Sequence, residues 1–331
     1  MDSDWYQHFV DHGYAVVPSV ISKEKAKAYQ GSAFEWLKSF DNSELDLDKP
    51  STWTPENLPF VSEINTFNYY GVVHERFMWD IRLEPRVIDV FAKLWGTDEL
   101  LVSFDALNIT LPGRAGHVPR EKWLHVDQSP HRKGLQCIQG IVNLSESGPD
   151  DGGLTVLPGS HKLTETFFKE HTDPANWTRK DFYRYTPEEL SFFTDTHGLK
   201  EHKVTASPGD LIIWDSRLIH YGAEPKTIDP SSAEQKSTKP ATIRTVTYVS
   251  YAPASLASEE TLRTKRQAFE SWLATTHWPH ENISLRTNEP TFPDGSRDQR
   301  RLKPREEPEL TPRLLQLAGV TPYEGKGSVH K

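Results

Sequence analysis

The residues with the clearest chemical potential are His125 and Asp127, which stand one residue apart in the segment WLHVDQSP. In an extended strand, side chains at positions i and i+2 point to the same face, so this segment presents an imidazole and a carboxylate together. Two histidines and one carboxylate on a single face form the metal site of non-heme Fe(II) oxygenases, with the opposite face open for a co-substrate and dioxygen. His125 and Asp127 are therefore predicted to supply two of three iron ligands.

A second His-x-Asp pair, His171 and Asp173, competes for this role. The chain has 14 histidines, so a motif this short is expected to recur by chance. Pro174 follows this copy, and the surrounding segment 162–200 shows no strand pattern that would align the two side chains. We expect the second pair to lie in a surface loop.

The third iron ligand should be a histidine on a later strand. His220 ends the apolar run of DLIIWDSRLIH and follows Asp127 by 93 residues. An isolated histidine at a strand end is usually a structural residue that bonds a backbone carbonyl. Because His220 follows an intact His-x-Asp pair, we expect it instead to complete the facial triad.

A buried cation is predicted on the strand TIRTVTYVSYAP, where Arg244 stands among Thr, Val and Tyr. Burial of a guanidinium is costly unless an anion meets it. A planar guanidinium binds a carboxylate through two hydrogen bonds, so the distal carboxylate of a dicarboxylate co-substrate is a natural partner. A salt bridge to one of the 47 acidic residues, or a strand end that reaches solvent, is the alternative.

Taken in order along the chain, these motifs resemble the phytanoyl-CoA dioxygenase (PhyH) family of Fe(II)- and 2-oxoglutarate-dependent oxygenases. They are the first His-x-Asp pair, DDGGLTVLPGSHK, PGDLIIWDSRLIHYG and the strand that ends YVSYAPA. The opening FVDHGYAVVPSVIS is also similar, and TTHWPH resembles fungal members of the group. The similarity covers roughly residues 9–253. It implies a double-stranded β-helix (jelly roll), with iron held by His125, Asp127 and His220 and with 2-oxoglutarate held by Arg244.

One spacing departs from the family pattern, because Arg244 follows His220 by 24 residues, further than is usual in the family. The polar segment 224–241 accounts for the difference as an insertion between paired strands, and we expect it to form a mobile loop that acts as a lid. Arg217 is the alternative anchor. It stands three residues before His220, hence on the opposite face of the strand.

Further polar residues are candidates for the lining of the site. Three polar residues on predicted strands are candidates to contact the co-substrate or to order a water: Asn108, Gln139 and Thr155. A solvated strand face would explain these three residues equally well. Three that flank the metal motif are candidates to face the substrate: His117, Gln128 and His131. His161 in PGSHK is expected to be structural, since Pro and Gly there predict a tight turn.

The strands that must hold these residues are predicted from short apolar or alternating runs between about residues 100 and 252. Gly, Pro, Asp and Ser clusters separate the runs, a pattern typical of an all-β barrel or sandwich. A further short strand is predicted at 14–20. The segment 162–200 interrupts the series and has no clean period, so it stays unassigned.

Helices are predicted on either side of the strand region: from the N-cap Ser22 to Phe40, from Pro85 to Gly96, and from Ser255 or Ser258 onward. The charged segment 294–313 is predicted as a solvated linker or surface wrap. Because the flanking helices bury their apolar faces only against the sheet, one domain is expected over 1–331. It would comprise N-terminal helices at 22–96, a core at about 100–252 and an extension at 254–331.

The composition restricts the classes of partner. The 331 residues include 38 Lys and Arg against 47 Asp and Glu, a formal net charge of −9, which argues against sequence-independent binding to nucleic acids or anionic membranes. The single Cys137 excludes an intramolecular disulfide and a thiolate zinc cluster. With no apolar run of membrane-spanning length and an acidic start unlike a secretory signal, we expect a cytoplasmic protein.

Together the patterns predict a mainly β protein with flanking helices that uses Fe(II), 2-oxoglutarate and dioxygen. It would oxidise a C–H bond of a small-molecule substrate (a metabolite, amino acid or acyl derivative) and release succinate and carbon dioxide. In related halogenases a small residue replaces the carboxylate ligand, whereas Asp127 is present here. Two other classes stay open: a cupin-like metalloenzyme that does not use 2-oxoglutarate, and a non-catalytic jelly-roll binding protein.

Overall fold

The computed structural model describes residues 4–40, 44–226, 242–287, 289–291, 295–298 and 300–323. The chain divides into two compact units, one within 1–67 and 107–248, the other within 68–106 and 249–331. The prediction of a single domain over 1–331 stays a prediction. Among the described helices, none combines the length and hydropathy that crossing a membrane requires.

The α-helices are α1 (Asp4–His12), α2 (Lys23–Lys38), α3 (Arg76–Arg82), α4 (Pro85–Trp95), α5 (Thr164–His171), α6 (Pro187–Ser191), α7 (Glu259–Glu270) and α8 (Pro312–Ala318). The strands are β1 (Tyr14–Val17), β2 (Thr66–Phe67), β3 (Leu100–Val102), β4 (Leu107–Thr110), β5 (His125–Val126), β6 (Ile138–Asn143), β7 (Gly153–Val156), β8 (Tyr183–Arg184), β9 (His202–Lys203), β10 (Leu211–Asp215), β11 (His220–Ala223) and β12 (Arg244–Pro253).

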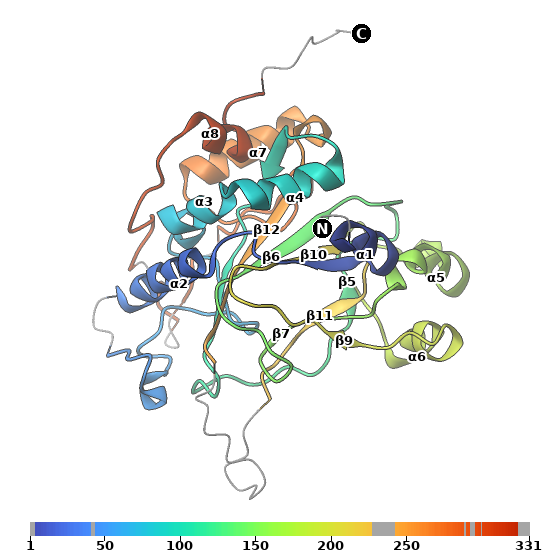
Figure 1. Ribbon diagram of the computed structural model, residues 1–331, viewed down its shortest axis with the longest axis horizontal. Helices are drawn as coiled ribbons and strands as arrows, with labels where there is room; N and C mark the ends of the chain where they lie inside the picture. Colours follow the sequence, from blue (N-terminus) through green and yellow to red (C-terminus); the bar gives the residue numbers. More distant parts are fainter. Residues whose placement is uncertain are drawn as a thin grey trace, which may run out of the picture. The chain divides into compact units, whose positions relative to one another are not determined.

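The first unit contains two mainly antiparallel sheets (Figure 1). The larger has the strand order β1-β10-β6-β12-β4-β2, and the smaller has the order β8-β5-β11-β7-β9. β12 runs on into the second unit, where Tyr251–Pro253 pairs with β3. The prediction of a mainly β fold with flanking helices is confirmed.

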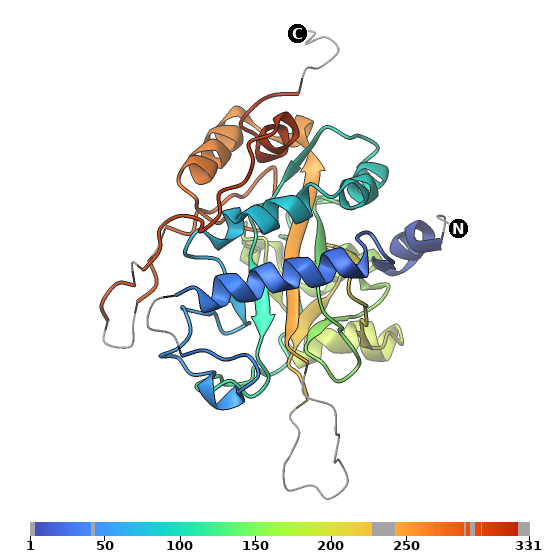
Figure 2. The ribbon, with the colours of Figure 1, turned by 60° about the vertical axis from the view of Figure 1, so that its left-hand side comes forward.

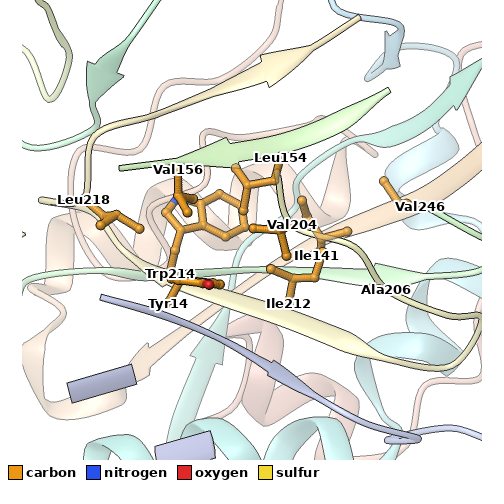
Figure 3. Close-up of a cluster of buried hydrophobic side chains, with 10 residues drawn as sticks. All are labelled: Tyr14, Ile141, Leu154, Val156, Val204, Ala206, Ile212, Trp214, Leu218 and Val246. Atoms are coloured by element: carbon orange, nitrogen blue, oxygen red, sulfur yellow. The ribbon is translucent and has the colours of Figure 1, made fainter. Parts of the chain in front are cut away.

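The core of the first unit lies between these sheets (Figure 3). Ile212 and Trp214 project from β10, and Leu154 and Val156 project from β7, each pair at positions i and i+2 and therefore on one face of its strand. Full burial of such a side chain contributes about 1.5–3 kcal/mol. The alternating runs read from the sequence are thus the inward faces of the two sheets.

The opposite face of the smaller sheet is covered by the segment 162–200, which the sequence left unassigned. Val126, Ile219 and Tyr221 alternate along their strands with the inward residues and pack against aromatic side chains of this segment: Phe167, Phe168, Tyr185 and Phe193. α5 and α6 lie on this side of the sheet in Figure 1. The segment thus forms part of the core, and its aromatic residues hide any helical period because they pack among themselves as well as on the sheet.

The helix predicted from Ser22 is confirmed as α2. The Ser22 side chain accepts a hydrogen bond from the backbone N–H of Lys25, which satisfies one of the donors left open at a helix start. Gln30 donates from Nε2 to Oγ1 of Thr245 on β12 (3.2 Å), and Trp36 meets Phe67 edge to face. Figure 2 shows α2 crossing the strands of the larger sheet.

The other two predicted helices are also present. α4 starts at Pro85 and is stopped by Gly96, whose φ of 70° lies in the left-handed region that glycine tolerates. α7 starts after the N-cap Ser258, one of the two predicted starts, and ends at Glu270. α1, α3 and α8 were not predicted; they have 9, 7 and 7 residues, too few turns for a clear period.

The charged segment 294–313 is a surface wrap in its described part, not a solvated linker. Asp298 is 3% exposed and accepts a 2.6 Å hydrogen bond from the hydroxyl of Tyr70. The carboxylate of Glu75 accepts from the backbone N–H groups of Arg305 and Glu306. These bonds hold the segment to the second unit, of which it is part.

A lysine is buried in the second unit. Lys265 on α7 donates from Nζ to the carbonyl oxygen of Val102 (2.6 Å) and stands 4.2 Å from the ring centre of Phe104. Its charge has no carboxylate partner among the described residues. Burial, with a smaller contribution from the nearby charge of Arg82, lowers the pKa of Lys265 to about 7.

Lys265 should therefore make stability depend on pH. Between about pH 7 and the ordinary lysine pKa of 10.5, the unfolded chain holds a proton here that the folded chain lacks, so the free energy of unfolding should rise with pH. In Lys265→Met this rise should be smaller. The measurement is urea unfolding at about pH 7.5 and 9.5. Arg263→Met, an exposed position on α7, is the control and should keep the wild-type slope; an equal slope in Lys265→Met would contradict the prediction.

Candidate metal centre

β5 and β11 bring the predicted iron ligands together. The two strands pair with His125 directly opposite His220, and Asp127 follows β5 with its backbone N–H bonded to the carbonyl oxygen of Ser216 (3.0 Å). The possible ligand atoms of the three residues lie within 4.8 Å of one another, and all three residues are buried. Nε2 of His125 is 3.5 Å from Oδ1 of Asp127, and Nε2 of His220 is 3.3 Å from Oδ2.

Both imidazoles are oriented in the same way. Nδ1 of His125 bonds the carbonyl oxygen of Trp123 (3.0 Å), and Nδ1 of His220 bonds the carbonyl oxygen of Leu218 (2.8 Å), each two residues earlier in the chain. A carbonyl oxygen only accepts, so these bonds assign the ring proton to Nδ1. The Nε2 lone pairs then face the carboxylate, as metal coordination requires. The donor set of two neutral nitrogens and one carboxylate fits Fe(II).

Gln139 holds the carboxylate in this arrangement. It lies on β6 in the larger sheet and donates from Nε2 to Oδ2 of Asp127 (2.9 Å). Gln139 is one of the predicted candidates for a co-substrate contact, which stays a prediction, and its amide nitrogen lies on the carboxylate of the candidate ligand Asp127. Such bonds fix the geometry of a ligand, so this contact suits a residue that positions the Asp127 carboxylate.

Aromatic rings surround the two imidazoles. Trp123 is stacked on His125 with ring centres 4.2 Å apart and planes 8° apart, and Phe182 lies 5.0 Å from the same ring. Trp214 lies 5.5 Å from His220. Phe182 is 45% exposed although it is a large apolar residue. Sequence reasoning missed it because it belongs to the unassigned segment 162–200.

Arg244 is the first residue of β12, and its side chain is buried, with 4% of the residue exposed. Nη1 donates to Oδ1 of Asn108 (3.2 Å), whereas the buried Nε has no hydrogen-bond partner among the described residues. No carboxylate there lies within ion-pair distance of the guanidinium, so the salt-bridge alternative has no support. Burial lowers the pKa of Arg244, while Tyr248 and Asp151 oppose that shift. A buried, incompletely paired guanidinium is suited to an anionic ligand.

Arg217, the alternative anchor, is already paired. Its Nη2 lies 2.6 Å from Oδ2 of Asp215, and Nε contacts the same carboxylate. A guanidinium neutralised in this way has less to offer a second carboxylate. The structure therefore favours Arg244.

Thr155, Asn108 and His117 make no contact with the triad that the structure shows. Thr155 faces away from His220, because its neighbour Val156 is the residue opposite His220. Asn108 contacts Arg244 and also Thr110 and the backbone of Ile64. His117 is paired with Glu224 (3.0 Å) at the start of the predicted lid segment, of which 227–241 lies outside the described residues.

The remaining candidates and the second His-x-Asp pair have contacts of their own. Gln128 bonds Ser216 and the carbonyl oxygen of Gly134, and His131 lies against Trp177. His161 is buried and bonds the carbonyl oxygen of Val10. Of the second His-x-Asp pair, His171 packs on Phe167 and Phe192, and Asp173 caps a short 3-10 helix through Ala175.

Comparison with known proteins decides the family. The chain matches the sequence model of phytanoyl-CoA dioxygenase (PhyH) over residues 9–230. This chain belongs to the PhyH family. Membership makes it a non-heme Fe(II)- and 2-oxoglutarate-dependent dioxygenase, as predicted, and the buried His-Asp-His triad has the donor set that such a family member requires.

Two relatives show the range of the family. "Ava biosynthesis cluster protein O" of Aspergillus versicolor is 39% identical over 286 residues, which are 85% of this chain and 87% of the relative. An ectoine dioxygenase of Sphingopyxis alaskensis is 30% identical over 63% of this chain and 66% of the relative.

Solved structures agree on the fold. EctD from S. alaskensis matches with a TM-score of 0.51 and 21% identity over 78% of this chain and 79% of that one. The epimerase SnoN matches with a TM-score of 0.51 and 16% identity over 76% and 82%. These likenesses confirm the double-stranded β-helix.

The triad predicts a specific loss of iron. In Asp127→Ala the anionic ligand is gone, so iron per chain after anaerobic reconstitution and desalting should fall from about one to a small fraction. Metal analysis by mass spectrometry is the measurement. Asp173→Ala, in the second His-x-Asp pair, is the matched control and should retain iron like the wild type. Full iron retention in Asp127→Ala would show that the carboxylate is not a ligand.

Proposed function

We propose that this chain oxidises a C–H bond of a small organic metabolite, with 2-oxoglutarate and dioxygen as co-substrates and succinate and carbon dioxide as co-products. The observation that carries the proposal is the buried triad, in which two Nε2 atoms and one carboxylate converge with their other contacts already satisfied by the protein. The buried Arg244, with Nε unpaired among the described residues, supports a dicarboxylate co-substrate.

Each residue has a defined role in this proposal. His125, Asp127 and His220 hold Fe(II) on one face, and Arg244 binds the distal carboxylate of 2-oxoglutarate, with Asn108 holding the guanidinium in place. When bound, the iron and 2-oxoglutarate supply the oxidising power through reduction of dioxygen and loss of carbon dioxide. The protein contributes ligand geometry, exclusion of water and placement of the substrate.

The side chains around the triad serve these tasks. The hydrogen bond from Gln139 holds Oδ2 of Asp127 and so restricts rotation of the carboxylate. Trp123 covers one face of the His125 imidazole, and Trp214 packs beside the His220 imidazole at an angle, so both rings help to exclude water. Phe182 is the exposed member of this group, next to His125, and is our candidate for contact with an apolar part of the substrate.

A biosynthetic intermediate is the substrate class we favour. The relative from Aspergillus versicolor, of which the chain spans 87%, carries a name from a biosynthesis cluster. The net charge of −9 gives no support for an acyl-CoA, whose phosphates need a basic entry. The cytoplasm is the location we propose, in line with the single cysteine. The broad test is a metabolite screen that reads succinate release from the iron-loaded protein.

Arg244 gives the sharpest test of co-substrate use. Arg244→Met should weaken 2-oxoglutarate binding by about 2–5 kcal/mol, because a buried charge-assisted pair is lost. The measurement is the visible band that forms when 2-oxoglutarate binds the anaerobic Fe(II) protein, titrated to give Kd. Arg217→Met is the control, since Arg217 is paired with Asp215, and its band should form as in the wild type. If Arg217→Met loses the band while Arg244→Met keeps it, the anchor is Arg217.

A further inference from the structure

β8 presents an arginine on the face of the smaller sheet that carries the candidate iron ligands. Arg184 pairs with His125 across β8 and β5, and paired residues of antiparallel strands project from the same face with Cβ atoms about 4.5–5.5 Å apart. The next rung joins Val126 and Tyr183, which pack in the aromatic cluster on the opposite face. Arg184 therefore flanks His125 on one side, as His220 flanks it on the other.

The guanidinium of Arg184 is available to a ligand. Arg184 is exposed, and its one hydrogen bond among the described residues runs from Nη2 to the carbonyl oxygen of Lys122 at 3.5 Å. No carboxylate in the described part of the chain pairs with it. The neighbouring cations Lys122 and Arg132, by contrast, are paired with Glu201 (3.0 Å) and Asp181 (2.6 Å). Arg184 thus keeps N–H groups that can bind an oxyanion through two parallel bonds.

Two apolar rings stand beside this cation. Phe182, two residues before Arg184, lies 5.0 Å from the ring of His125 and is 45% exposed. Trp123 is stacked on His125 at 4.2 Å and is itself only half-buried. Because Phe182, Trp123 and Arg184 all reach solvent, this edge of the metal face is open. A substrate that enters there meets one positive charge and two aromatic rings.

An ion pair fixes the position of β8. The side chain of Asp181 is 1% exposed and accepts from Nε and Nη2 of Arg132, at 2.6 and 2.9 Å, and from the backbone N–H of Ser129 at 2.9 Å. Arg132 and Ser129 belong to the segment that directly follows Asp127. Arg184 is therefore held near the ligands both by the ladder with β5 and by this pair. A cation fixed in this way loses less freedom when it binds a ligand.

We propose that Arg184 binds an anionic group of the substrate, a carboxylate or a phosphate, and so selects the molecules that are placed at the iron. This inference rests on the proposed function, which makes the triad the centre of oxidation. It adds a substrate class: a molecule with an apolar part, which lies against Phe182, and one oxyanion group, which lies at Arg184. The net charge of −9 does not oppose such a site, because distant surface charges are screened within about 10 Å.

The test uses probes that differ only in charge. Phenylacetate, 4-phenylbutanoate and 6-phenylhexanoate are compared with their neutral amides and with phenylalkyl phosphates of the same lengths. The anaerobic Fe(II) protein is first saturated with 2-oxoglutarate, and each probe is titrated by the shift that it causes in the visible band. At least one anionic probe should bind about tenfold more tightly than the amide of its length, the size of a charge-assisted hydrogen bond.

Three variants assign this preference to one residue. Arg184→Met should abolish it, so that the anionic probe and the amide bind alike, and Arg184→Lys should restore part of it. Arg179→Met is the matched control, an exposed arginine of the same segment, and should keep the wild-type preference. The Kd of 2-oxoglutarate and the iron content should stay at the wild-type level in all three, since neither arginine is a proposed ligand of iron or of the co-substrate.

The same titrations identify the anion. Tighter binding of the phosphate than of the acid of equal length, lost in Arg184→Met, would assign a phosphate to Arg184. The reverse order, lost in the same variant, would assign a carboxylate. Either result supports the inference.

Three results would overturn it. The first is that no anionic probe binds more tightly than its amide, and the second is that the preference survives in Arg184→Met. The third is that the anionic probe removes the band, because it then replaces 2-oxoglutarate at the iron. Failure of the proposed function is distinct from these results: 2-oxoglutarate would give no band with the wild-type Fe(II) protein before any probe is added.

Discussion

One rung of the ladder between β5 and β11 sets the geometry on which the site depends. His125 and His220 are direct partners across these strands, so the separation of their rings, 4.3 Å between centres, is a property of the backbone pairing. A slip of one residue would turn either imidazole to the opposite face, which is filled by the aromatic cluster around Phe167. The apolar packing on both faces of the smaller sheet therefore protects the register, and the register holds the metal site.

The carboxylate depends on a different constraint. Asp127 lies beyond the two-residue strand, and its position comes from its backbone bond to Ser216 and from the Gln139 amide on the larger sheet. The two histidines are thus fixed by one sheet, and the carboxylate is fixed between the two sheets. The interface that buries Trp214 and Val156 is also the interface that aligns the third ligand.

The triad was predictable because its information is local: a two-residue spacing, strand alternation and an apolar run before His220. The same holds for α2 and α4, whose ends carry Ser22, Pro85 and Gly96. The bond of Gln139 to Asp127, and the bond of Arg244 to Asn108, depend on how strands distant in the sequence face each other. A single sequence contains no direct record of that arrangement.

The secondary structure of the segment 162–200 could not be assigned from the sequence for another reason. Its aromatic residues pack on the sheet and on one another, so no single period marks a buried face. The two residues of β8 are also too few to show alternation. For the segment 294–313 the charge pattern left two alternatives, a solvated linker and a surface wrap. The contacts with Glu75 and Tyr70 favour the wrap in its described part.

β8 has a consequence for how such an enzyme can diverge. It pairs with β5, and the residue before it, Phe182, lies against the ring of His125, so a segment that supplies no proposed metal ligand still forms part of the wall around the metal. Changes of sequence or length in that segment would reshape the wall without altering the residues proposed as metal ligands. The architecture thus allows the wall that faces the substrate to change while the strands that carry the proposed iron ligands stay the same.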